Sequence, residues 1–489
     1  MAENIGMVPL LSLSMIQESI MGAKLDYNSE RKREARKRLD YYSGDQRRHT
    51  DDVMRAQFQN PERMRLQLEF SNITREIVDQ VSMLYKKPAK RTLLVGGKPV
   101  SDEIAARYAE MTRVSQLDSV MKRVNRFTTL LNTVGVQVAW RKDCLCLDIL
   151  TPDLVDVAQD PWDPTTAVAV LIYRSFYNTM SWDKAVNPYT DKILVVAWTA
   201  EQHMVFDNMG RRQPQLANDQ GVNPYGMIPV AWFRDAHPMG CFFNDGSYDL
   251  VQAQESLNIK LTELNYLLKM QAFSVPVIIQ DDTPGTVTID PSVFVHIPLK
   301  SIPGAGQPDF KFVSPDPKVN ELLEAIRDMT VRTARSWGIS PDAFKLVGSA
   351  TSGFALRMQN MRLLERREDD ADIYAVAEQN LFRVMRAVWN AHSPEGAKIP
   401  EEAELSVDFT EPVFPEDPDA EQRRWESLVR QGLKSKADWL MEIDPDVKTL
   451  EEAEEKLRKN MEINARVAGS APAPSEALNG LVDGEEEPA

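Results

Sequence analysis

Apolar residues recur at helical spacing in several stretches of the first 132 residues. The clearest stretch covers 72–86 and ends just before Pro88. Its apolar face consists of Ile73, Ile77, Val81 and Leu84. Residues three and four positions apart lie on one side of an α-helix, so this pattern predicts an amphipathic helix. The same spacing predicts helices over 15–45 and 102–132, and the two glycines of "RTLLVGGKPV" predict a hairpin between them.

The pattern changes at Val134, where apolar and polar residues begin to alternate. "VGVQVAW" and "CLCLDIL" alternate on either side of a turn at "RKD", and similar segments continue as far as "IPVAWF". A period of two is typical of strands that bury one face. Proline-rich turns separate the segments, so the sequence predicts a mostly antiparallel sheet and an α+β class.

Helical spacing returns in the second half of the chain. It predicts a helix of about 26 residues that ends near 272, and another over 316–337 that ends at Gly338. Between them, 273–315 is rich in proline, glycine and β-branched residues, which predicts a small β insert. A helix of about 38 residues is then predicted from Phe354 onward. Its apolar stripe consists of Tyr374, Ala377, Leu381, Val384, Met385 and Val388.

A run of small residues separates the last two predicted helices, within "LVGSATSGFALRMQ". Gly348 and Gly353 permit backbone angles that other residues avoid. Ser349, Thr351 and Ser352 compete with helix formation through local hydrogen bonds. We therefore expect a loop that is able to move, although a plain inter-helix turn would have the same composition.

Negative charge is concentrated at the end of the chain. The net charge is -16, and residues 401–489 contain 24 acidic and 10 basic residues, a net of -14. Two short helices are predicted there, in "LVRQGLKSKADWLMEI" and "TLEEAEEKLRKNMEINARV", followed by a disordered acidic tail. A globally acidic protein is a poor static binder of nucleic acid, because phosphate contacts need lysine and arginine. A basic cluster at 31–48 is either a surface past which DNA slides or a solvated helix face.

Candidate catalytic and metal chemistry is weak throughout. "VGGKPVS" lacks the spacing of a phosphate-binding loop, the five histidines lie far apart, and no nucleophile motif occurs. Cys144 and Cys146 form a C-x-C on a predicted strand, which favours buried strand cysteines over a zinc site. We predict no catalytic residue, no metal and no cofactor. The three cysteines fit a reducing compartment, and no apolar run approaches the about 18 residues of a membrane span.

The order of these parts resembles the portal proteins of tailed bacteriophages, in particular the siphophage-like family. The resemblance is carried by "RLDYYSGDQ", "NITREIVDQVSMLYKKP", "DGSYDLVQAQESLN", "WGISPDAFKLVGSATSGFALRMQNMRLLE" and "LKSKADWLMEIDPDVKTLEEAEEKLRKNMEI". It implies a portal fold with long stem and wing helices, an antiparallel β wing region, a small α/β clip insert and a helical crown. The implied parts are a first wing part at 1–244, stem helices at 245–272 and 316–337, a clip at 273–315, a tunnel loop at 338–353, a second wing part at 354–414, a crown at 415–470 and a tail at 471–489.

The resemblance also implies a function. Portals of this family form dodecameric rings at one capsid vertex, nucleate procapsid assembly and pass double-stranded DNA without sequence specificity during packaging and ejection. Their partners are further copies of the chain, the terminase large subunit, head-completion (adaptor) proteins, and the major capsid and scaffolding proteins. We therefore expect a virion protein that is assembled in the host cytoplasm, has no membrane partner and is not an enzyme.

The resemblance places the loop at the narrowest part of the channel. Its implied residues are Lys345, Gly348, Ser349, Thr351, Ser352 and Gly353. Lys345 is the candidate for a phosphate contact. Two alternatives stay open: another structural or scaffolding ring protein of the virion, and a metal-dependent nuclease that uses Asp369, Asp370 or Asp372.

Overall fold

The computed structural model describes most of the chain in two compact units. The described residues are 29–57, 67–175, 193–207, 210–216, 221–243, 249–272, 275–279, 295–297, 309–313, 319–340, 360–410, 418–444, 447 and 449–468. The first unit comprises 1–348 and 359–412, and the second comprises 349–358 and 413–489. In the part of the chain that is described, no helix is long and apolar enough to cross a membrane.

The described part of the first unit opens with five helices. They are α2 (Glu30–Ser43), α3 (Arg47–Gln57), α4 (Ile73–Val81), α5 (Asp102–Val114) and α6 (Leu117–Leu131). Of these, α5 and α6 contribute to one apolar cluster and α2, α4 and α6 to another. The Asn72 side chain caps α4 by accepting from the Arg75 amide at 3.0 Å. The predicted helix at 72–86 is too long, because α4 ends at Val81 with Ser82 as its C-cap residue. The single helix predicted at 102–132 is wrong, because Gln116 adopts a left-handed conformation that separates α5 from α6.

Two antiparallel sheets follow, as the alternation predicts. One has the order β4-β3-β9, from Cys144–Leu150, Thr133–Arg141 and Val230–Arg234. The other has the order β5-β6-β7-β8, from Val155–Gln159, Ala167–Ser175, Ile193–Trp198 and His203–Asp207. A short 3-10 helix, η1, covers Pro214–Leu216. Every strand pair in these two sheets is antiparallel.

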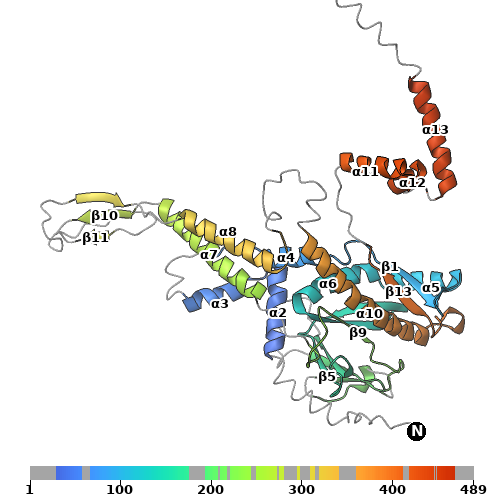
Figure 1. Cartoon of the computed structure of the whole chain (residues 1–489). Helices are drawn as coiled ribbons and strands as arrows, with labels where there is room; N and C mark the ends of the chain where they lie inside the picture. The colour runs from blue at the N-terminus through green and yellow to red at the C-terminus, as the bar shows by residue number, and fades with distance from the viewer. Residues whose placement is uncertain are drawn as a thin grey trace, which may run out of the picture. The chain divides into compact units, whose positions relative to one another are not determined.

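Two helices then run side by side in the first unit (Figure 1): α7 (Asp249–Ala272) and α8 (Val319–Ser336). The chain between them forms a mixed three-stranded sheet. Its central strand β10 (Val275–Ile279) pairs in parallel with β11 (Val295–Ile297) and antiparallel with β12 (Asp309–Val313). The predicted β insert between two helices is thus confirmed in its described residues.

The long helix α10 (Met361–His392) packs against β3 and β9, and Figure 1 shows β9 beneath it. All six residues of its predicted apolar stripe are buried. The described helix starts at Met361, with Asn360 as its N-cap residue, and the predicted start at Phe354 lies outside the described residues. A short 3-10 helix, η4 (Glu395–Ala397), follows it. β13 (Glu404–Asp408) then pairs with β1 (Lys90–Val95), which forms the predicted hairpin with β2 (Lys98–Pro99).

Two arginines hold the end of the first unit to α10. Arg386 donates to the carbonyl oxygens of Pro400, Glu401 and Ala403. Arg367 donates to those of Phe409 and Thr410 at 2.7 and 2.9 Å. Hydrogen bonds from a charged donor are stronger than neutral ones, so these two side chains fasten the segment around β13 to the helix.

The described part of the second unit contains α11 (Pro418–Arg430), α12 (Lys436–Ile443) and α13 (Leu450–Ala468). Ser435 and Asp438 form a capping box at the start of α12. Trp425 stacks on Trp439 with ring centroids 5.8 Å apart. The single helix predicted in "LVRQGLKSKADWLMEI" is therefore two, and the capping box explains why α12 starts afresh.

Candidate functional site

The end of α8 and the start of α10 meet at Gly338. This residue has a φ of +79°, a left-handed conformation that glycine adopts at little cost. A side chain added there would lie 3.6 Å from the Cβ of Arg362 and 3.7 Å from a methyl group of Leu363. Gly338 therefore ends α8, as predicted, and brings it into contact with the first turn of α10.

Apolar burial and one aromatic contact strengthen this junction. Ile339 is 2% exposed and Leu363 is 5% exposed, and both belong to one apolar cluster. The guanidinium carbon of Arg366 lies 5.4 Å from the centre of the Trp337 ring, within the range of a cation–π contact. The Ile339 amide donates to the Ala334 carbonyl oxygen at 3.0 Å. The segment 341–359 thus leaves and re-enters the described structure at neighbouring points.

The predicted loop residues lie outside the described residues. They are Lys345, Gly348, Ser349, Thr351, Ser352 and Gly353. Their roles stay predictions. The structure describes the residues that flank their segment, at the end of α8 and the start of α10.

A polar stripe on α7 is the feature that sequence reasoning missed. Gln254, Asn258 and Thr262 occur every fourth residue and are each 0% exposed. Beside them, the leucines at 250, 257, 261 and 264 join the apolar cluster that also contains α8 residues. The four-residue spacing of polar side chains in a leucine-rich helix was the signal that could have revealed this second buried face.

Each member of the polar stripe bonds to the N-terminal part of the chain. Gln254 accepts from the Thr74 amide at 3.1 Å and donates to the Ser71 carbonyl oxygen. Asn258 donates to the Gln46 side chain at 2.7 Å. Thr262 accepts from the amide of Glu69 at 3.1 Å. A buried polar group that is left without a hydrogen-bond partner lowers the folding stability by about 1–3 kcal/mol. These hydrogen bonds therefore hold α7 against the N-terminal segments.

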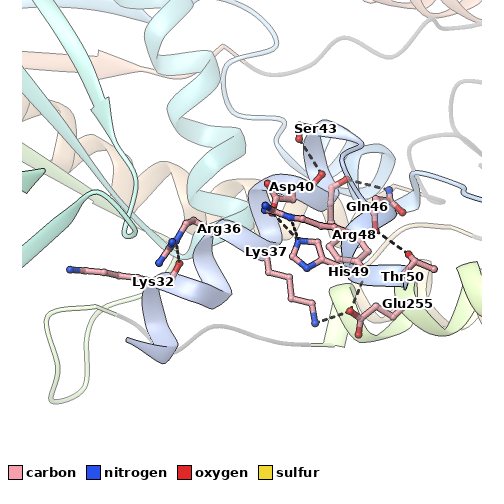
Figure 2. A network of polar contacts seen from close by, with 11 residues as sticks. Lys32, Arg36, Lys37, Asp40, Ser43, Gln46, Arg48, His49, Thr50 and Glu255 are labelled. Carbon is pink, nitrogen blue, oxygen red and sulfur yellow. Dashed lines mark hydrogen bonds and ion pairs between the residues drawn. The ribbon is translucent and has the colours of Figure 1, made fainter. Parts of the chain in front are cut away.

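The basic cluster at 31–48 is largely occupied within the chain. Lys32 is 0% exposed and pairs with Asp156, to which Arg31 also donates. Figure 2 shows Lys37 reaching Glu255 on α7, at 2.7 Å. Arg38 is buried and donates to the Leu130 carbonyl oxygen at 3.3 Å. Neither interpretation of the cluster holds as a whole, because several of its charges join α2 to β5 and α7.

Asp40 is the acidic centre of the same region. Its carboxylate accepts from Arg48 and lies 2.8 Å from His49 Nε2, as drawn in Figure 2. Burial alone would raise the pKa of Asp40, but the hydrogen bonds from His49 and Arg48 outweigh it and lower that pKa. Tyr41 donates to Glu255 at 3.0 Å, which adds a second link between α2 and α7.

The acids considered for a nuclease are not gathered into a site. Asp369 and Asp372 are exposed, whereas Asp370 is partly buried. Burial raises the pKa of Asp370 to about 6, with Asp235 and Asp369 adding to the rise and Arg366 opposing it. In the described ranges, no group of three or more histidine, cysteine, aspartate or glutamate side chains could hold a metal ion.

The prediction of buried cysteines in "CLC" is wrong. Cys144 is exposed and Cys146 is only partly buried, while Leu145 between them is 1% exposed. Burial does not alternate along this strand, because Leu145 and Leu150 lie on opposite faces and each is buried in a different apolar cluster.

Comparison with known proteins gives one match at the family level. A model of the family described as "Phage portal protein, SPP1 Gp6-like" matches residues 168–464, which is more than half of the chain. No curated protein matches the chain.

Two solved structures are similar over most of their length. One is titled "Neck of empty GTA particle computed with C6 symmetry", at 13% identity, with 80% of this chain and 92% of that chain covered and a TM-score of 0.41. The other is titled "Neck of native GTA particle computed with C12 symmetry", at 13% identity, with 81% and 92% covered and a TM-score of 0.39.

Proposed function

Because the chain belongs to the SPP1 Gp6-like phage portal protein family, we propose that it forms a dodecameric ring at one capsid vertex. DNA enters and leaves the capsid through this ring, which docks the terminase large subunit and, later, the head-completion proteins of the tail. The ring also nucleates procapsid assembly with the scaffolding and major capsid proteins. The chain is a structural component of the virion rather than an enzyme, and the ATPase is its partner.

The observation that carries this proposal is the family match, which spans the helix pair, its insert, the junction and the long helix. We assign α7 and α8 to the stem, the β10–β12 sheet to the clip and α11–α13 to the crown. The wing comprises the N-terminal helices and both antiparallel sheets, together with α10 and the β1–β2–β13 sheet. These assignments follow the chain order, with the helix bounds taken from the structure.

The junction at Gly338 gives the tunnel loop a physical role. A loop whose two ends are held together can change its own conformation without displacing the helices that carry it. Closing such a loop through a fixed base also reduces the entropy lost when it becomes ordered. We propose that the tunnel loop at 338–353 forms the rim of the channel and follows the passing duplex, and that Lys345 contacts phosphate there.

The charge of the chain supports transit rather than retention of DNA. Tight static binding requires many lysine and arginine contacts with phosphate, and each contact makes binding more sensitive to salt. A net charge of -16 opposes such contacts. A channel of this composition lets the duplex slide without a sequence-specific hold.

The test is packaging by phage that carry Ser352→Leu and Gly353→Leu together. We expect normal ring assembly but few DNA-filled heads, because two leucines stiffen the loop and enlarge its side chains. Alanine at the same two positions is the control, and it should package more DNA than the leucine variant. Full packaging by the leucine variant would refute the moving loop.

A further inference from the structure

The second half of α13 buries none of its described side chains. Ala453 is 0% exposed and packs with Ala437 and Val447, and Leu457 joins the same small cluster. Met461 continues the stripe one turn further, yet it is 59% exposed. Every described side chain from 458 to 464 is exposed. The helix therefore extends beyond the cluster that stabilises its first half.

Charge is segregated along the same helix. The first half carries four acids, the middle carries three bases, and the last turns carry one of each, Glu462 and Arg466. The four acids are Glu451, Glu452, Glu454 and Glu455, and the three bases are Lys456, Arg458 and Lys459. The helix dipole favours acids in the first turn and bases in the last turn, and its effect fades within one turn. It does not explain bases in the middle of a helix that runs to Ala468.

The apolar cluster that α13 joins is small. Among the described residues it contains three buried side chains, those of Ala437, Val447 and Ala453, so it stabilises only the first half of the helix. An unsupported helical segment of about ten residues is marginal in water. Both facts favour a neighbour that covers the exposed half of α13.

We propose that the neighbour is a second copy of this chain, in an inference that rests on the proposed ring. Adjacent copies place their α13 helices parallel and offset by about one turn. Arg458 and Lys459 of one copy then lie level with Glu454 and Glu455 of the next copy. Without the offset, acids would face acids and bases would face bases, and such like-charge contacts are destabilising.

The offset contact is head-to-tail. It repeats around a closed ring when the helices tilt along the circumference, because copies in a cyclic ring are related by rotation without translation. In a cyclic ring, each subunit uses one surface toward one neighbour and a different surface toward the other. Here the two surfaces are the acidic and the basic parts of one helix. Lys459 and Glu455 also pair within a copy at 2.8 Å, but both side chains are more than half exposed and can reach a neighbour.

The experiment uses two double variants of the full chain with opposite charge changes. One is Arg458→Glu with Lys459→Glu, and the other is Glu454→Lys with Glu455→Lys. Native mass spectrometry at the lowest protein concentration that keeps the wild type fully in rings measures the fraction of chains in rings. We expect most chains of each variant to leave the ring when it is alone, and an equal mixture of the two to restore it. The control, Arg423→Glu with Arg424→Glu on α11, reverses the same number of charges and should leave the ring intact.

Each result has a defined meaning. Rings that persist in both double variants overturn this contact but leave the portal function standing. Loss that mixing does not repair also overturns it, because the residues then support each copy's own fold or bind another protein. If the wild type forms no ring even with capsid and scaffolding proteins present, the proposed function fails and this inference fails with it.

Discussion

Replacing Gly338 with alanine tests whether the left-handed glycine stabilises the junction between α8 and α10. The substitution adds one methyl group at a residue whose φ is +79°. A left-handed conformation costs a residue with a Cβ roughly 1–2 kcal/mol. The nearest atoms to the new methyl group, on Arg362 and Leu363, would lie at 3.6 and 3.7 Å, which is ordinary contact. The whole cost should therefore come from the backbone and not from a clash.

The expected consequence is local opening at the end of α8. A loss of 1–2 kcal/mol corresponds to a roughly 5–30-fold rise in the population of the open state. The amides of Gly338 and Ile339 report on this opening, because each donates a hydrogen bond of 3.0 Å to the last turn of α8. Hydrogen exchange followed by mass spectrometry should show peptides over 334–340 exchanging faster by that factor.

Gly396→Ala is the matched control. That glycine does not have a positive φ, and a Cβ there would meet nothing within 4 Å. It should leave exchange at 334–340 unchanged and should not destabilise the protein. Unchanged exchange at 334–340 in Gly338→Ala would refute the claim that the left-handed glycine secures the junction, and so would an equal effect of both variants.

Three further predictions concern the buried stripe, a carboxyl group and the insert. Asn258→Leu should lower the free energy of unfolding, measured by urea denaturation, by about 2–4 kcal/mol, because it removes a hydrogen-bond partner from both the Gln46 and the Gln254 side chain. The control Gln252→Leu, on the exposed side of α7, should change it by less than about 0.5 kcal/mol. The pKa of Asp370 is raised to about 6, so its carboxyl group binds a proton more tightly in the folded state than in the unfolded state. The stability that comes from this proton is fully present below about pH 4 and is lost as the pH rises through 6. Asp370→Asn should therefore stabilise the protein at pH 7 by about 1–2 kcal/mol, after a discount for partial exposure, and flatten its stability between pH 4 and 7; no gain at pH 7 would contradict the burial argument. Replacing 273–315 with a short linker should abolish terminase binding in a pull-down while the helix pair stays folded, and normal binding would remove the clip assignment.

Local patterns predicted the elements whose faces are decided by burial. The stripe of α10 was predictable because apolar residues at helical spacing over many turns have few alternatives. The strands of the two antiparallel sheets were predictable from the alternation of apolar and polar residues. The break at Gln116 was not, because a left-handed non-glycine residue leaves no composition signal.

Long-range polar pairing explains most of what the sequence did not reveal. Lys32 and Asp156 are 124 residues apart, and Gln46 and Asn258 are 212 residues apart. Nothing local distinguishes a buried lysine with a distant aspartate from a solvated one. The basic cluster and the polar stripe of α7 could therefore be understood only once the folded chain brought their partners together. The loop residues from Lys345 to Gly353 stay predictions.

The mass and symmetry of the purified full chain test the central claim most directly. Native mass spectrometry with negative-stain class averages should find a ring of twelve copies of the 55.4 kDa chain, about 665 kDa, with a central hole wide enough for a DNA duplex. If the protein alone is a monomer, the same measurement is repeated with capsid and scaffolding proteins. A chain that stays monomeric in their presence would contradict the account.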